Sequence, residues 1–163
     1  MKMAEALAEL KSGDVLFWRD QSIISRFIRW WTHSPYSHCG LFWRRGDTPM
    51  IIEIDEHGLN IETWATHRKP VAFGQTHLAW TPEVEAFAVH HYERARYGYI
   101  DAALVGLGFQ PLSKNRGVEC AEYVRDVCAK AGWSLPWAPT PGHIAEQIEI
   151  ATGISIVELE VMP

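Results

Sequence analysis

Cysteine is scarce in this sequence, and no two cysteines have the spacing of a metal or redox motif. The three cysteines, Cys39, Cys120 and Cys128, are an odd number without a CxxC pattern. Such a set is typical of a reducing compartment. At 163 residues, 47% of them hydrophobic, the chain is large enough to bury a core without disulfides. We therefore expect a single domain over residues 1–163.

Long hydrophobic runs are absent as well. No run approaches the roughly 20 residues that a membrane-spanning helix needs. The first residues, Met1 to Glu5, include an acid where a signal peptide has a basic segment followed by an apolar one. We therefore expect no transmembrane segment and no export by the usual route. This leaves a cytoplasmic protein, or one released without a signal peptide, for example in a virion.

Positive charge is neither abundant nor clustered. The formal net charge is −5, and the 15 lysine and arginine residues are scattered along the chain. Surfaces that bind nucleic acid or anionic membranes gather such residues. We therefore expect no nucleic-acid partner. Internal repeats and low-complexity tracts are also missing.

The residue that stands out among those present is Cys120, at the start of an expected helix. From Cys120 onward, apolar residues recur at i, i+4, i+7, i+8 and i+11, and Gly132 follows as a stop signal. Unpaired N–H groups and the helix dipole at a first turn favour the thiolate, which is the nucleophilic form of cysteine. A lone cysteine is more often a small core residue, so a catalytic interpretation requires a base and an orienting group.

His38 and Glu53 supply these two groups on neighbouring expected strands. A two-residue turn at Arg45-Gly46 would place His38 directly opposite Glu53, with Cβ atoms about 5 Å apart. Glu53 lies in an otherwise apolar run, where a carboxylate is costly unless it is paired. We therefore predict a hydrogen bond between the imidazole and this carboxylate.

Pro49 leaves a second register open. A longer turn would shift the pairing by two residues and bring Asp55 to His38 in place of Glu53. Asp55 is therefore the alternative orienting acid.

The remaining patterns predict further helices and strands around this hairpin. We expect helices over residues 4–10, 22–31, 81–96, 101–108 and 141–150, and strands over residues 15–18, 37–43, 50–55, 58–64, 154–161 and within 71–80.

Cys120, His38 and Glu53 together are the set that a cysteine hydrolase needs: a nucleophile, a base, and a group that orients the base. A zinc site is the competing interpretation of the same region. It would use His38, Cys39, Cys120 and Cys128, but no pair of these has ligand spacing. Cys39 also faces away from His38 on the same strand, and we expect it to point away from the site. We expect no metal and no cofactor.

Several short motifs follow one another in a fixed order over residues 12–146. They are Ser12-Gly13-Asp14-Val15-Leu16, Tyr36-Ser37-His38-Cys39-Gly40, Ile52-Glu53, Tyr97-Gly98-Tyr99-Ile100-Asp101, Cys120 with Val124, and Thr140-Pro141-Gly142. In these motifs the chain resembles the circularly permuted branch of the NlpC-type papain-like cysteine hydrolases, called YiiX/YebB-like.

The resemblance implies both a fold and an activity. The fold is α+β, with an antiparallel sheet or half-barrel packed against helices that include the cysteine helix. The activity is that of a peptidase or amidase, cleaving amide bonds in cell-wall-type peptides (peptidoglycan) or related acyl-amides through an acyl-enzyme. By position, Cys120 is the nucleophile, His38 the base and then the acid, and Glu53 the orienting carboxylate.

The sequence departs from the family beside the nucleophile. Ala121 stands where the family usually has serine, although its backbone N–H can still donate to an oxyanion. Glu119 places a negative charge next to Cys120, which opposes thiolate formation. Tyr36 and Tyr97 would line the cleft or donate to the oxyanion, or else pack in the core with their hydroxyls satisfied.

Two other functions remain open on this scaffold. Acyltransferases or thioesterases of the lecithin:retinol type would use the same thiolate and base, but an acyltransferase passes the acyl group to an amine or alcohol. A non-catalytic binding module would retain the fold with an inert thiol.

Overall fold

The computed structural model describes residues 1–19, 26, 29–30, 34–55, 57–92, 119–135, 138 and 140–160. A six-stranded antiparallel sheet with the order β4-β3-β2-β1-β5-β6 forms its centre. The strands are β1 (Val15–Trp18), β2 (His38–Arg45), β3 (Thr48–Asp55), β4 (Gly58–Thr63), β5 (Ala72–Gly74) and β6 (Val157–Glu158). The helices are α1 (Met3–Glu9), α3 (Pro82–His90), α5 (Cys120–Lys130) and α6 (Pro141–Thr152).

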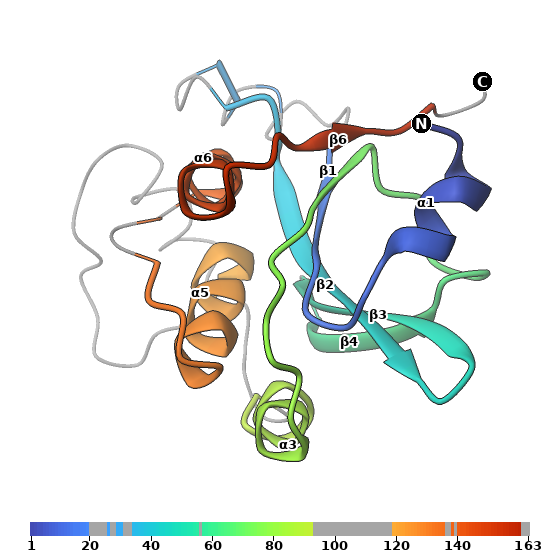
Figure 1. Cartoon of the computed structure of the whole chain (residues 1–163), viewed down its shortest axis with the longest axis vertical. Helices are drawn as coiled ribbons and strands as arrows, with labels where there is room; N and C mark the ends of the chain where they lie inside the picture. Colours follow the sequence, from blue (N-terminus) through green and yellow to red (C-terminus); the bar gives the residue numbers. More distant parts are fainter. Residues whose placement is uncertain are drawn as a thin grey trace.

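The two faces of the sheet carry two separate hydrophobic clusters. Along β1, Val15 and Phe17 belong to the cluster that contains α5, whereas Leu16 and Trp18 belong to the cluster that contains Ala6 of α1. Figure 1 shows α3, α5 and α6 on one side of the sheet and α1 on the other. This division follows from the alternation of side chains along a strand, and it confirms the expected α+β class.

Helix α5 begins at Cys120, as the sequence predicts. Its buried residues form one stripe that packs against the sheet, and the chain leaves the helix at Gly132 with a φ of 85°, a conformation that favours glycine. The stripe is Cys120, Ala121, Tyr123, Val124, Val127 and Cys128. Because Cys120 is the first helical residue, its sulfur lies at the positive end of the helix dipole.

Most of the other predicted elements are confirmed within a few residues. The closing strand is shorter than expected, since only Val157–Glu158 pairs with β5. Helix α3 ends at His90, and residues 93–96 of its predicted range lie outside the described residues. The helix predicted over residues 101–108 lies outside them entirely. Of the helix predicted over residues 22–31, only residues 26, 29 and 30 are described.

The two ends of the described chain lie side by side (Figure 1). The amino group of Met1 donates a hydrogen bond to the carbonyl oxygen of Glu158 at 3.1 Å, and the N–H of Glu160 donates to the carbonyl of Met1 at 2.9 Å. Among the described helices, none is long and apolar enough to cross a bilayer.

Candidate active site

The hairpin of β2 and β3 determines which side chains meet. Leu41 lies opposite Ile52, and Arg45 lies opposite Thr48, so the turn is Gly46-Asp47. The predicted turn, one residue earlier, is therefore wrong. The pairing is shifted by two residues, as in the second register left open by the sequence, although the turn has moved and is not longer. The physical reason is Gly46, whose φ of 59° suits the first position of a two-residue turn, where glycine is favoured.

In this register Gly40, and not His38, is the nearest neighbour of Glu53 on the adjacent strand. A Cβ atom built on Gly40 would lie 2.9 Å from the Cβ of Glu53 and 3.4 Å from Cζ3 of Trp18. Without that Cβ atom, His38 reaches Glu53 diagonally, and its Nε2 lies 2.8 Å from Oε2 of Glu53. The predicted partners therefore meet, although not directly opposite each other.

Asp55, the alternative acid, is engaged elsewhere. Its Oδ1 accepts a hydrogen bond from the backbone N–H of His57 at 2.7 Å, in the turn between β3 and β4. It is Glu53, therefore, that the structure brings to the imidazole.

A second histidine, His67, occupies the other oxygen of Glu53. Its Nε2 lies 2.8 Å from Oε1 of Glu53, and its Nδ1 lies 2.7 Å from the carbonyl oxygen of Arg68. The Arg68 guanidinium lies 3.8 Å from Oε2 of Glu53. His67 was not predicted as a site residue, because it stands in the basic turn after β4 and no spacing or periodicity links that turn to β3.

Trp18 covers this polar cluster. Its ring lies 5.4 Å from the ring of His38 and 5.4 Å from that of His67, and its Nε1 donates to the carbonyl of Arg68 at 3.2 Å. All three titratable side chains are buried: His38 is 7% exposed, Glu53 2% and His67 6%. Because water is largely excluded, the charges in this cluster interact more strongly than they would on the surface.

Cys120 interacts electrostatically with His38, and Cys39 acts on the same thiol, so that these side chains shift one another's pKa values. His38 is the first residue of β2, at the end of the sheet, and alternation places its side chain on the Trp18 face. Helix α5 packs on the opposite face, so the thiol and the imidazole meet around the strand end. With Nε2 of His38 bonded to Glu53, Nδ1 is the ring nitrogen left for Cys120.

Cys39 does not lie where the sequence predicts. Cys39 does face away from His38 along the strand, but α5 packs on that same face, so the Cys39 thiol lies beside Cys120 and not away from the site. Alternation gives the face of a side chain and does not tell which helix covers that face.

The pKa values of the site follow from these contacts. Hydrogen bonding from Cys39 and the charge of His38 hold the pKa of Cys120 well below its usual range, although burial opposes this. Burial would lower the pKa of His38, but Cys120 and Glu53 raise it to about 10. Glu53 is buried too, yet hydrogen bonds from His38 and His67 hold its pKa well below the ordinary carboxyl value. The site therefore favours a thiolate, an imidazolium and a carboxylate in a row.

The other candidate residues have separate places. The hydroxyl of Tyr36 donates to Oε1 of Glu158 at 2.9 Å, and its ring stacks on Phe17 at 4.7 Å. Ala121 is buried in the first turn of α5, next to Cys120. Tyr97 lies outside the described residues.

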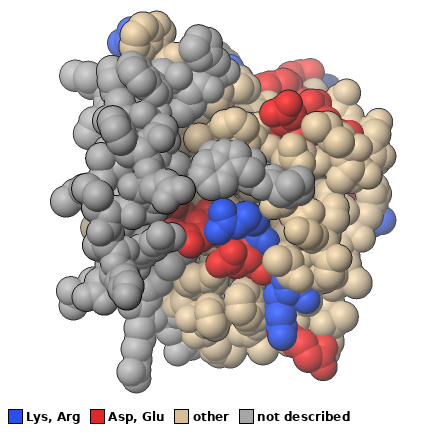
Figure 2. All heavy atoms as spheres, turned by 90° about the vertical axis from the view of Figure 1, so that its left-hand side faces the viewer, with Lys and Arg blue, Asp and Glu red and all other residues tan. Residues whose placement is uncertain are grey.

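The described residues contain no group of three or more His, Cys, Asp or Glu side chains arranged to hold a metal ion. Figure 2 shows acidic and basic side chains next to one another on the face of the molecule that includes α5 and α6. On α5, Arg125 pairs with both Glu122 and Asp126, at 3.7 and 3.5 Å. Charges of opposite sign are thus mixed on this helix.

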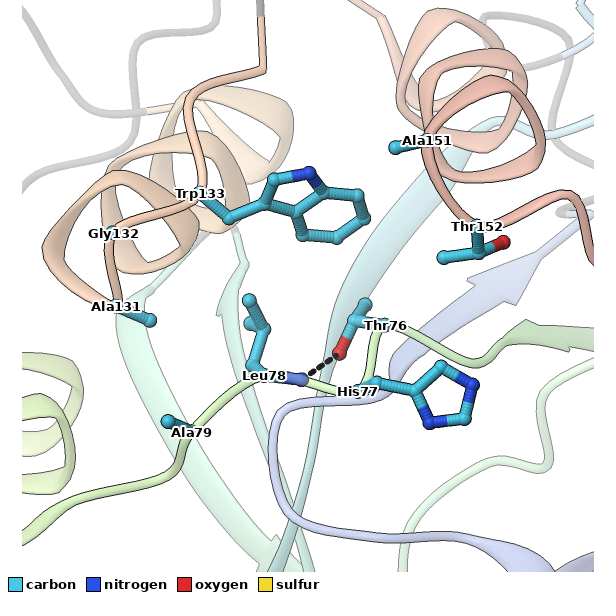
Figure 3. A pocket seen from close by; sticks show the side chains of 9 residues that line it. All are labelled: Thr76, His77, Leu78, Ala79, Ala131, Gly132, Trp133, Ala151 and Thr152. Carbon is cyan, nitrogen blue, oxygen red and sulfur yellow. Dashed lines mark hydrogen bonds between the residues drawn. The ribbon is translucent and has the colours of Figure 1, made fainter.

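A cavity of about 340 Å³ lies at the far end of α5 from Cys120. In Figure 3 the side chains of Trp133, Leu78 and Thr76 point toward it. An 11-residue helix is roughly 16 Å long, so this cavity is separate from the thiol.

Comparison with known proteins finds no family model and no curated protein that matches the chain. Among solved structures, the chain is similar to the metalloprotein YiiX from Escherichia coli O157:H7, with 16% sequence identity and a TM-score of 0.44. The match covers 91% of this chain and 88% of that chain. Similarity at this level does not assign the chain to a family.

Proposed function

We propose that this protein is a cysteine hydrolase, a peptidase or amidase with the catalytic residues Cys120, His38 and Glu53. The observation that carries the proposal is the 2.8 Å hydrogen bond between His38 and Glu53, with the His38 ring in reach of a thiol at the first residue of a helix. Nucleophile, base and orienting group in contact are the signature of covalent catalysis by cysteine.

In the first half of the reaction, the Cys120 thiolate attacks the carbonyl carbon of an amide. Backbone N–H groups of the first turn of α5, including that of Ala121, have no partner within the helix and suit the developing oxyanion. The His38 imidazolium then gives its proton to the leaving amine, and an acyl-enzyme remains.

In the second half, neutral His38 takes a proton from water, and the resulting hydroxide attacks the thioester. The acid product leaves, and the thiolate and imidazolium are restored. Glu53 holds the His38 ring through Nε2, so that Nδ1 stays directed at the sulfur throughout.

The substrate class follows from the resemblance of the motifs to the permuted NlpC-type hydrolases. We propose amide bonds of cell-wall-type peptides, or related acyl-amides, as the substrates. Circular permutation agrees with the chain order, in which the nucleophile follows the base and the carboxylate.

The test is to incubate the purified chain with a panel of muropeptides and acyl-amides, next to the Cys120→Ala variant. We expect release of free amine by the wild type and none by the variant. Transfer of the acyl group to an added amine or alcohol in preference to water would replace hydrolysis with the acyltransferase function. Equal turnover by Cys120→Ala would contradict the proposal.

A further inference from the structure

Both ring nitrogens of His67 face oxygen atoms. Nε2 lies 2.8 Å from a carboxylate oxygen of Glu53, and Nδ1 lies 2.7 Å from the backbone carbonyl of Arg68. A carbonyl oxygen only accepts hydrogen bonds, and so does an ionised carboxylate. Neutral histidine carries one N–H and can donate only one of these two bonds.

Glu53 is ionised in this arrangement. Its Oε2 accepts from His38 Nε2 at 2.8 Å, and the Arg68 guanidinium lies 3.8 Å from the same oxygen. A protonated carboxyl would give up one of these contacts, and burying the carboxylate is tolerable only because its oxygens are paired.

We propose that His67 is held as an imidazolium and is a positioning residue. It orients the Glu53 carboxylate toward His38 and weakens the electrostatic effect of that carboxylate on His38. This inference rests on the proposed function, because its effect reaches Cys120 only through His38. His67 transfers no proton in the catalytic cycle and keeps both of its N–H groups throughout.

The surroundings of His67 are consistent with a cation there. Burial lowers its pKa, but the hydrogen bonds to Glu53 and to the Arg68 carbonyl raise it above the ordinary value. Among the residues that the structure describes, the groups that face the ring are Glu53 from β3, Trp18 from β1 and Arg68 from its own turn. Lys69 Nζ donates to the backbone carbonyl of His67 at 3.3 Å. Glu53 is the negative group among them, so its carboxylate is shared between two imidazolium rings.

The sharing of the Glu53 carboxylate between His38 and His67 affects the pKa of His38. A carboxylate that is paired with one cation attracts a proton on the second ring less strongly than an unpaired one. Replacing His67 by glutamine keeps one N–H donor for Glu53 but removes the positive charge. The pKa of His38 should then rise, since Glu53 acts on it alone.

The experiment has two parts and uses the full chain. First, the ring nitrogens of His67 are observed by ¹H–¹⁵N correlation spectroscopy at pH 7, where both are expected to carry a proton. Second, the pKa of His38 is measured by the same method in the wild type, in His67→Gln, and in the control His90→Gln, which changes an exposed histidine on α3. We expect His67→Gln to raise the pKa of His38 by about one unit, and the control to leave it unchanged.

A neutral His67 at pH 7 would overturn the inference, and so would a pKa of His38 that is the same in His67→Gln and in the wild type. Because the first part needs neither substrate nor activity, it succeeds or fails independently of the proposed hydrolysis. If His67 is fully protonated but the chain has no hydrolytic activity, the assignment of an imidazolium stands. The proposed function is then rejected, and with it the positioning role of His67 in catalysis.

Discussion

At the scale of single residues, three cysteines in one core have three different environments. Cys120 is favoured as a thiolate by Cys39 and His38, whereas burial raises the pKa of Cys39, and the same cause raises that of Cys128 to about 12. Depth alone does not separate the three thiols, because all of them are buried. Contact with an imidazolium does.

We predict that iodoacetamide modifies Cys120 before the other two cysteines at pH 6, because thiolate is the reactive form and only Cys120 has a lowered pKa. Mass spectrometry of the modified peptides measures the order. His38→Ala should slow labelling of Cys120 at least about tenfold at this pH, because loss of the imidazolium raises the pKa of Cys120, and each unit by which that pKa exceeds the pH lowers the thiolate fraction about tenfold. Equal labelling of the three cysteines would mean that no activated thiol exists.

Cysteine-to-alanine substitutions form a matched pair. Cys120→Ala should abolish hydrolysis, whereas Cys128→Ala should retain it, because Cys128 is fully buried two turns further along α5. Removing the buried Cys128 sulfur should cost about 1 to 2 kcal/mol in the free energy of unfolding. Urea unfolding and amine release measure the two effects. Activity that survives in Cys120→Ala and is lost in Cys128→Ala would reverse the assignment.

At the scale of elements, the hairpin of β2 and β3 depends on a glycine in mid-strand. Gly40→Ala places a methyl group 2.9 Å from the Cβ of Glu53 and 3.0 Å from the carbonyl oxygen of Ile52, and a backbone atom cannot easily move away. We predict a loss of about 1 to 3 kcal/mol in stability and a larger relative loss of hydrolysis, because Glu53 is displaced from His38.

The control for this substitution is Ala72→Gly, which changes a buried residue of strand β5, on the far side of β1 from β2, without adding an atom. It should lower stability by about 1 kcal/mol and leave the kcat of the folded protein unchanged. If both variants lose activity only in proportion to their folded fraction, Gly40 has no special relation to the site.

The elements themselves were predictable from the sequence, and their contacts less so. Periodicity located the start of α5 at Cys120, and alternation assigned His38 and Glu53 to one face of the hairpin. The register was wrong by two residues because turn chemistry at Gly46 outweighed the expected turn. Neither Cys39 beside Cys120 nor His67 on Glu53 was predictable, since both contacts depend on how distant elements pack, which no local pattern encodes.

At the scale of the whole molecule, the buried charges link stability to pH. The pKa of Glu53 is lower in the fold than in the unfolded chain, so its contribution to the free energy of unfolding is fully present above about pH 4.3. This contribution is lost as the pH falls toward the pKa of Glu53 in the fold. His67 has a raised pKa, so its contribution is present below about pH 6.5 and is lost as the pH rises. Between about pH 6.5 and pH 8.5 the folded state keeps a proton on His38 but has lost one from Cys120, relative to the unfolded chain. The effects of these two residues on the pH dependence of stability therefore nearly cancel in this range.

We therefore predict that the free energy of unfolding decreases between pH 6.5 and 8.5, with a slope of at most about 1.4 kcal/mol per pH unit from His67. Urea unfolding at a series of pH values measures the slope. It should flatten in His67→Gln and persist in His90→Gln. A curve for His67→Gln that runs parallel to that of the wild type would show that His67 loses no proton-linked stability.

The hydrogen bonds between Met1 and the strand at Glu158 and Glu160 have a consequence for chain topology. Because the ends of the described chain already lie together, backbone cyclisation through a short linker would leave the fold in place. A closed ring has fewer unfolded conformations, and loops of this size lose on the order of 4 kcal/mol of unfolded-state entropy. A cyclised chain should melt at a higher temperature, and reopening the ring in an exposed turn, such as Gly46-Asp47, would give the same molecule with a new order of elements.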